Sequence, residues 1–361
     1  MGFDPYSTYW LQKSVEMLPP VNTFLKNRYF PDGETFETEK VVVEYRNGRR
    51  KAAPFVTSRS SGIELEREGS TIREYTPARI APKRTLTLDI LKRRGFGEPL
   101  NSQMTPQQRA LYYNTQDLDE MRPTIAITKE AMAAQVIFEN KLTFTEYTDN
   151  IEKGFDREIK FYEGTNDAVY TPSKPWDYTE ESGKQIIADI TAMIKKQSQR
   201  GLPATELLCS PEAADVILNN VYIQKMLDNR RIEVGKIAPE ELIDGAVEFA
   251  TLNINGRTIS FISYDNSYEG LDGKLKTFIP AGYVALAAPA KGVAGTNVIG
   301  QTLYGAVTQM ERDEEYHTYS GIEVPKYMSN VNTNERSLTL TSAPLVMPIA
   351  NDPFVVSKVV F

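Results

Sequence analysis

The order of apolar and polar positions predicts a short amphipathic start, then β-strands, and then long helices. Residues 8–30 begin with an amphipathic segment that Pro19-Pro20 must interrupt, so we expect an arm with one or two short helices. Residues 38–46, TEKVVVEYR, are rich in Val and end at Asn47-Gly48, a dipeptide typical of tight turns. This run predicts a β-strand.

Residues 51–83 form a long polar ribbon. IELE, at 63–66, alternates apolar and acidic residues after the four-residue turn RSSG at 59–62, which predicts a β-hairpin. The first arm is basic and the return is acidic, with Arg46, Arg49, Arg50, Lys51 and Arg59 facing Glu64, Glu66 and Glu68. Cross-strand pairs of this kind contribute about 0.2–1 kcal/mol each. Because a two-stranded ribbon is marginal in water, we expect it to dock on its own domain or on another subunit.

Helix signals follow the ribbon. TPQQRALYYNTQDLDE opens with Thr105 as N-cap, Pro106 at the first helical position and Gln108 to complete a capping box. A second helical run is expected after Pro123, from about Thr124 to Glu139. Its apolar positions share one face and are Ile125, Met132 and Val136.

A second alternating run and a mixed α/β region complete the pattern. Residues 141–170 alternate and break at Gly154, which predicts another hairpin, and residues 171–184 resemble a connector. The elements expected beyond it are a helix ending at Gly201, a strand ELLCS, a helix begun by Ser210-Pro211, and the strands TISFISY and GYVALAAPA.

The composition limits the classes of function. The chain has 361 residues, enough to bury a substantial core without a partner. Its 41 Lys and Arg against 48 Asp and Glu give a net charge of −7, which argues against a protein whose main task is to clamp nucleic-acid phosphates. A single cysteine excludes an intrachain disulfide and a thiolate metal cluster. No run reaches the roughly 18 apolar residues of a membrane span, so we expect no membrane partner.

The residues that could carry chemistry favour structural roles. His317 is the sole histidine, and no Gly-x-Ser-x-Gly elbow accompanies it, so we interpret it as structural. Cys209 precedes a helix start, which can lower a thiol pKa, but a small apolar residue at the end of a buried strand is the favoured interpretation. The acidic run at 311–315 is typical of a solvated face. The sequence therefore predicts no catalytic, cofactor-binding or metal-binding residue.

Four stretches, in order, resemble the phage capsid protein E family, which comprises the major capsid proteins of lambda-type tailed bacteriophages. They are FLKNRYF (24–30) followed by FETEKVVV, GSTIREYTPARIAPK (69–83), FIPAGYVAL (278–286) followed by LYGAV (303–307), and SAPLVMPIANDPFVVSKVVF (342–361). The resemblance covers essentially the whole chain. It implies an α+β fold, the Hong Kong 97-type phage capsid fold.

The resemblance also implies a division of the chain. The parts expected are an N-terminal arm with the first strand at 1–46, an extended E-loop hairpin at 47–84, a peripheral domain with a spine helix and a hairpin at 85–183, an axial domain at 184–320, and a return to the peripheral domain at 321–361. The E-loop and the N-terminal arm are expected to make the main contacts between subunits. The E-loop contact residues expected are Arg49, Arg50, Arg59, Gly62, Glu64, Glu66 and Arg67.

The function implied is a major capsid protein and not an enzyme. Copies would assemble as hexamers and pentamers into the icosahedral head of a tailed phage, in the host cytoplasm, around double-stranded DNA touched only non-specifically. A separate scaffolding protein is expected because the E-loop begins before residue 50, together with a portal and, in some heads, a decoration protein. Residues 52–82 contain no lysine, so we expect a noncovalent shell. The alternatives are the shell of a gene-transfer particle or nanocompartment, and a carboxylate-dependent hydrolase that uses residues 311–315.

Overall fold

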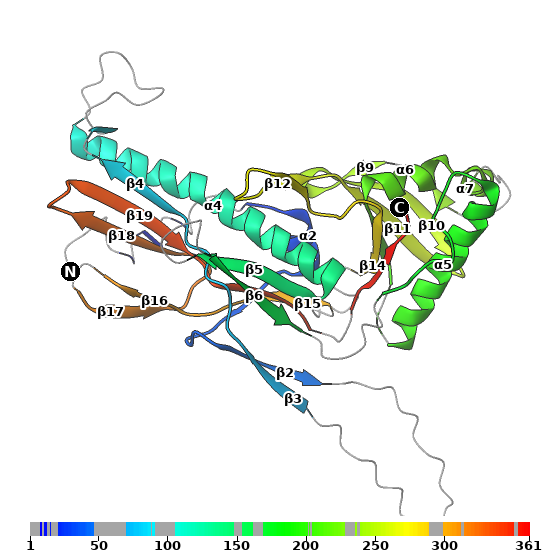
Figure 1. Ribbon diagram of the computed structural model, residues 1–361, viewed down its shortest axis with the longest axis horizontal. Helices are drawn as coiled ribbons and strands as arrows, with labels where there is room; N and C mark the ends of the chain where they lie inside the picture. The colour runs from blue at the N-terminus through cyan, green and yellow to red at the C-terminus, as the bar shows by residue number, and fades with distance from the viewer. Residues whose placement is uncertain are drawn as a thin grey trace, which may run out of the picture.

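The computed structural model describes most of the chain. The described residues are 8, 11–12, 15, 21–46, 70–87, 89–90, 105–147, 154–161, 169–200, 202, 204–227, 235–236, 239–288, 299–311, 314–349 and 353–361. One long helix, α4, runs along much of the molecule, a lobe with α5, α6 and α7 lies at one end, and a ribbon of β2 and β3 leaves the body from the side (Figure 1).

Helix α4 (Pro106–Glu139) contains 34 residues and is therefore about 51 Å long. Its capping box is formed as predicted: Thr105 Oγ1 accepts a hydrogen bond from the Gln108 amide at 3.3 Å, and Gln108 Oε1 accepts one from the Thr105 amide at 2.9 Å. The helix ends at Asn140, which has a left-handed φ of 54°.

The expectation of two helical runs separated at Pro123 is wrong, because Pro123 lies inside one continuous helix. A proline costs a helix one N–H donor and strains one turn. On either side of it Met121 and Ile125 are buried in a shared core. We infer that their packing holds the helix together across the proline.

Two three-stranded sheets lie along this helix. One has the order β18 (Val324–Asn330), β19 (Glu335–Thr341), β4 (Lys83–Thr87) and is antiparallel. The other has the order β1 (Asp32–Thr35), β15 (Gly300–Tyr304), β20 (Pro344–Pro348), with β1 and β15 parallel. The first sheet buries Tyr327, Leu338 and Leu340 against the long helix and against Leu11 and Val15 near the N-terminus.

The remaining small sheets are two-stranded ribbons. They pair β2 (Val41–Arg46) with β3 (Ser70–Tyr75), β5 (Lys141–Tyr147) with β6 (Gly154–Lys160), β12 (Ser267–Glu269) with β13 (Leu275–Thr277), and β16 (Val307–Met310) with β17 (Tyr316–Tyr319). The hairpin predicted within 141–170 is confirmed as β5 and β6. Gly154 begins β6, where a Cβ atom would lie 2.4 Å from the Thr145 side chain.

The end lobe is built on a seven-stranded sheet. Its order is β21 (Val355–Lys358), β14 (Tyr283–Ala287), β7 (Glu206–Cys209), β11 (Arg257–Tyr264), β10 (Ala246–Ile254), β8 (Gly235–Lys236), and β9 (Glu240–Glu241) also pairs with β10. The other elements of this lobe are α5 (Glu180–Gln199), α6 (Pro211–Asn219), α7 (Val221–Leu227) and the 3-10 turn η1 (Ile243–Gly245). Apolar side chains cover both faces of this sheet.

The helices of this lobe follow their local signals. Ser210 Oγ caps α6 by accepting a hydrogen bond from the Ala213 amide at 3.3 Å, as predicted. Helix α5 begins at Glu180, where Thr179 supplies its N-cap. The connector before it is tied down, since the Trp176 amide donates to the Val359 carbonyl at 2.7 Å.

In the last third of the chain, sheet membership does not follow the order of the strands along the chain. Strands β15, β16 and β17, within the range 184–320, lie outside the seven-stranded sheet. Strand β21, within the range 321–361, is an outer strand of that sheet beside β14. Alternation along a strand shows which residues share a face, but it does not show which sheet the strand joins.

Candidate functional site

The seven residues predicted to contact other subunits all fall within 47–69, outside the described residues. These residues are Arg49, Arg50, Arg59, Gly62, Glu64, Glu66 and Arg67. The structure does describe the two strands on either side of this segment. Residues of β2 and β3 pair in antiparallel register from Val41 with Tyr75 to Arg46 with Ser70. The strand predicted at 38–46 is thus confirmed as β2, and the chain leaves and re-enters the body on adjacent strands.

The root of this ribbon is fixed to the β5–β6 hairpin. The Tyr75 ring is buried, with its centre 5.6 Å from that of Phe161. Arg73 Nη1 donates to the Phe161 carbonyl at 3.1 Å, and Arg157 Nη2 donates to the Thr76 carbonyl at 2.9 Å. These contacts hold the ribbon at a defined angle to the body.

The other face of the ribbon is open. Val42 and Ile72 are 53% and 69% exposed, while the neighbouring Val41 is fully buried. Lys40 forms an ion pair with Glu74 at 3.3 Å on this exposed side. Within the described part of the chain, β2 and β3 form a sheet of their own. Exposed apolar side chains on a strand pair without a further neighbour are typical of a surface that another molecule covers.

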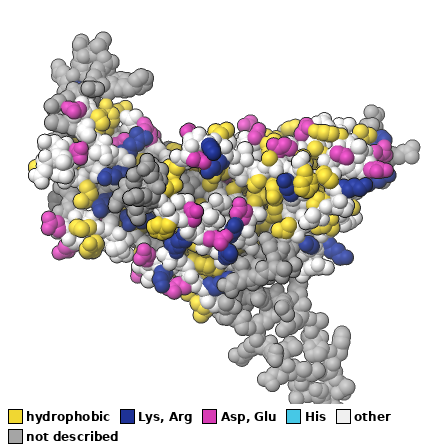
Figure 2. Space-filling model, viewed as in Figure 1, with side chains coloured by type: hydrophobic (Ala, Val, Ile, Leu, Met, Phe, Trp, Pro, Cys, Tyr) yellow, Lys and Arg dark blue, Asp and Glu magenta, His cyan; other side chains and the backbone are white. Residues whose placement is uncertain are grey.

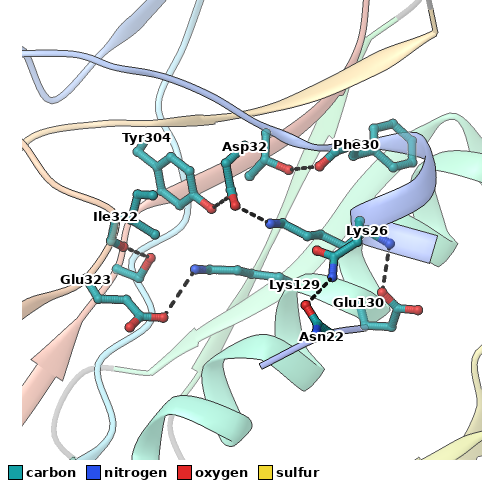
Figure 3. A network of polar contacts seen from close by, with 12 residues as sticks. Asn22, Lys26, Phe30, Asp32, Lys129, Glu130, Tyr304, Ile322 and Glu323 are labelled. Carbon is teal, nitrogen blue, oxygen red and sulfur yellow. Dashed lines mark hydrogen bonds and ion pairs between the residues drawn. The ribbon is translucent and has the colours of Figure 1, made fainter. Parts of the chain in front are cut away.

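A polar cavity of about 600 Å³ lies between the N-terminal segment, the long helix and residues 320–323 (Figure 3). Lys26 Nζ lies 2.6 Å from Asp32 Oδ2, and Tyr304 donates its hydroxyl to the same carboxylate. Lys129 Nζ lies 3.7 Å from Glu323, which also accepts a hydrogen bond from Arg122 Nε at 3.0 Å.

The charges in this cavity shift one another's titration. Burial alone would raise the pKa of Asp32, but Lys26, Tyr304 and Lys129 together lower it. Burial lowers the pKa of Lys129, and Glu323 opposes that shift. Burial raises the pKa of Tyr304, and Asp32 raises it further. Because each acid lies beside a cation, we interpret the cluster as structural. Asp32 joins the N-terminal segment to β15, and Glu323, the residue that precedes β18, is joined to the long helix.

Two further carboxylates hold the short helix α2 (Phe24–Tyr29). Glu130 accepts hydrogen bonds from the amides of Leu25 and Lys26. Glu206 accepts hydrogen bonds from the side chains of Arg28 and Tyr29. Sequence reasoning missed these residues, because each partner lies more than 100 positions away and leaves no local pattern.

The candidate catalytic residues have structural surroundings. Cys209 is fully buried, and this burial raises the pKa of its thiol, which contradicts activation at the helix start. Glu311 accepts hydrogen bonds from Thr8 and from the Tyr319 hydroxyl, so it ties the N-terminal segment to the β16–β17 ribbon. His317 lies on β17, paired with Gln309. The described residues contain no group of three or more metal-ligating side chains.

Surface charge and hydropathy add two observations. On the face drawn in Figure 2, basic and acidic side chains are interspersed and do not gather into one basic surface. In the described ranges, no helix combines the length and the apolar character needed to cross a membrane.

The family model of phage major capsid protein E matches residues 7–359. The chain belongs to this family. Among its relatives, the major capsid protein of Escherichia phage lambda is 22% identical over 352 residues, covering 97% of this chain and 98% of that protein. The major capsid protein of Enterobacteria phage P21 is 23% identical over 344 residues, covering 92% of each.

Solved structures agree with membership of the phage major capsid protein E family. A prophage capsid protein from Escherichia coli CFT073 superimposes with a TM-score of 0.62 at 15% identity, covering 98% of both chains. A phage-related protein from Bordetella bronchiseptica RB50 gives a TM-score of 0.50 at 9% identity, covering 96% of this chain and 95% of that one. The predicted fold class is confirmed: the chain has the α+β Hong Kong 97-type phage capsid fold.

Membership of this family decides between the classes of function left open by the sequence. Phage major capsid proteins are structural components of the virion that assemble into shells, and they are not enzymes. The carboxylate-dependent hydrolase at 311–315 is therefore excluded. The chemistry of this protein is self-association, and its functional surfaces are those that meet other copies.

Proposed function

We propose that this chain is the shell subunit of a tailed-phage head, arranged as hexamers and pentamers in an icosahedral lattice around double-stranded DNA. The proposal rests on the β2–β3 ribbon. Tyr75 anchors this ribbon to the body, and Val42 and Ile72 are exposed on its outer face. A ribbon of this kind gains stability when a neighbouring copy covers that face.

Within this proposal, residues 47–84 are the E-loop and residues 1–46 the N-terminal arm. Helix α4 is the spine of a peripheral domain, which would comprise residues 85–183 and the strands from β15 to β20. The seven-stranded sheet is the axial domain, and β21 belongs to it rather than to the C-terminal return. Sheet membership thus supports axial boundaries that differ from 184–320.

The other molecules expected to act with the shell subunit belong to the same proposal. A scaffolding protein and a portal are expected during assembly in the host cytoplasm, and some heads would add a decoration protein. Contact with packaged DNA is non-specific, because the subunit carries a net charge of −7 and the DNA must not adhere to the wall.

The proposed E-loop is tested by reversing charge in its return arm. Glu64→Lys with Glu66→Lys should reduce the yield of assembled particles at least about tenfold; a tenfold change in an association constant corresponds to about 1.4 kcal/mol in total. The melting temperature of the isolated subunit should stay within a few degrees. Sedimentation velocity measures assembly, and differential scanning fluorimetry measures folding. Normal assembly together with an earlier melt would overturn the E-loop assignment.

A further inference from the structure

We propose that helix α2 is a strut that fixes the long helix against the seven-stranded sheet, and that Glu130 and Glu206 are the positioning residues at its two ends. This inference concerns the isolated subunit and does not depend on the proposed shell function.

Helix α2 is too short to be stable alone. It has six residues, and its N-cap, Thr23, makes no side-chain capping hydrogen bond. Isolated helices of this length do not form in water. Its conformation must therefore come from the elements that surround it.

The first of these elements is the long helix. Glu130 on α4 is fully buried and accepts hydrogen bonds from the Leu25 amide at 2.6 Å and the Lys26 amide at 2.8 Å. The carboxylate thus takes the place of the missing cap, from more than 100 residues away. Amides at a helix start point along its axis, so this pair of bonds fixes both the position and the direction of α2.

The second element is the central strand region of the seven-stranded sheet. Glu206, the first residue of β7, accepts a hydrogen bond from Arg28 Nε at 2.9 Å and a second from the Arg28 guanidinium, and it also accepts one from the Tyr29 hydroxyl at 2.6 Å. The side chain of Glu206 is 6% exposed and Tyr29 is fully buried. A bidentate pair with this degree of burial has one favoured geometry.

Apolar contacts run in parallel with these polar ones. The Phe24 ring centre lies 5.2 Å from that of Tyr264 on β11, and the Phe30 ring centre lies 5.8 Å from that of Phe354. The strut therefore touches α4 on one side and the sheet on the other. Loss of either carboxylate leaves polar groups buried without a partner. This favours a different placement of α4 relative to the seven-stranded sheet.

The test measures the distance between the long helix and the end lobe. Spin labels on Thr115→Cys and Val221→Cys, both at exposed positions, report that distance by double electron–electron resonance. The native Cys209 is fully buried and stays unlabelled. The doubly labelled protein with no further substitution should give one narrow distribution of the distance between the two labels.

Glu130→Gln keeps the size of the side chain and removes its charge, and Glu139→Gln is the matched control on an exposed part of the same helix. We expect Glu130→Gln to broaden or shift the distribution and to speed amide exchange at residues 24–29 and 206–209 at least about tenfold, since charged hydrogen bonds are lost. The control should change neither. Should Glu130→Gln not fold, Arg28→Lys breaks the bidentate pair at the other end and is measured in the same way. An unchanged narrow distribution with unchanged exchange at 206–209 in the folded variant would overturn the strut.

Discussion

Charged side chains around the cavity are paired, and the pairs differ in exposure. Lys129 is almost fully buried, whereas the Asp32 side chain is 41% exposed. Buried charges are costly unless they are paired, so loss of the Lys129 partner should cost more than loss of a partner at the open rim. Asp32 lies at that rim, where water screens its pair with Lys26.

Asp32→Asn should lower stability at neutral pH and have little effect in acid. The folded-state pKa of Asp32 lies below its ordinary value, so its contribution is present above an unfolded-state pKa of about 3.9 and is lost as the pH falls through the folded-state pKa. The loss at pH 7 should be about 1 kcal/mol or less, because the pair is partly exposed.

Urea denaturation at pH 7 and near pH 3 measures this difference. Asp119→Asn, on the exposed face of α4, is the control for removal of one negative charge. If Asp32→Asn destabilised the protein equally at both pH values, the carboxylate would not be the stabilising group.

Among the helices and strands, the features that depend on residues close together in the chain were predicted from the sequence. The capping box at Thr105, the cap at Ser210 and the β5–β6 hairpin depend on residues a few positions apart, and all were predicted from the sequence. Pro123 was assigned as a break because its effect on a helix is local, but burial of its neighbours outweighs that effect. Tertiary packing often overrides such local preferences.

Sequence patterns could not predict the pairings that join distant segments. Helix α2 is capped by Glu130, and β21 joins β14 in a sheet whose other strands precede it in the chain. The segment FLKNRYF was singled out for its family resemblance, but nothing in its spacing identified Arg28 and Tyr29 as partners of Glu206. The predicted E-loop contact residues remain predictions, because they lie outside the described residues.

The open face of the β2–β3 ribbon predicts that a charge placed on it would disturb assembly more than folding. Ile72→Lys places a charge on an exposed strand position, so the free energy of unfolding of the subunit should change by less than about 0.5 kcal/mol. Assembly should fall sharply, because a charge cannot be buried without a partner when a neighbour covers the face.

Asn332→Lys, in the exposed turn between β18 and β19, is the control for adding a charge. Thermal denaturation and sedimentation velocity compare the two variants. Equal particle yields for Ile72→Lys and the unmodified protein would mean that the ribbon face is not an interface.

Considered as a whole molecule, the protein is a subunit whose work is repeated contact with its own copies. The fold supplies a body around α4, a lobe built on seven strands, and a ribbon that extends from the side (Figure 1). Proteins of this family form the shell of the virion. Stability of the shell then comes from many weak interfaces in a closed symmetric arrangement.

These interfaces should be noncovalent. Residues 52–82 contain no lysine, so the central part of the proposed E-loop offers no amine for an isopeptide bond. Purified heads boiled in denaturing detergent should therefore give a single band at the subunit mass of 40.7 kDa. A ladder of dimers, pentamers and hexamers would show that the subunits are cross-linked.

Electron microscopy of the expressed chain of 361 residues tests whether this protein assembles into a shell. Negative-stain images of the purified protein, taken across its size-exclusion profile, should contain rings, tubes or polyhedral particles with hexameric or pentameric units. A uniformly dispersed monomer at all concentrations, including in the presence of a co-expressed scaffolding protein, would contradict the assignment of this chain as a shell subunit.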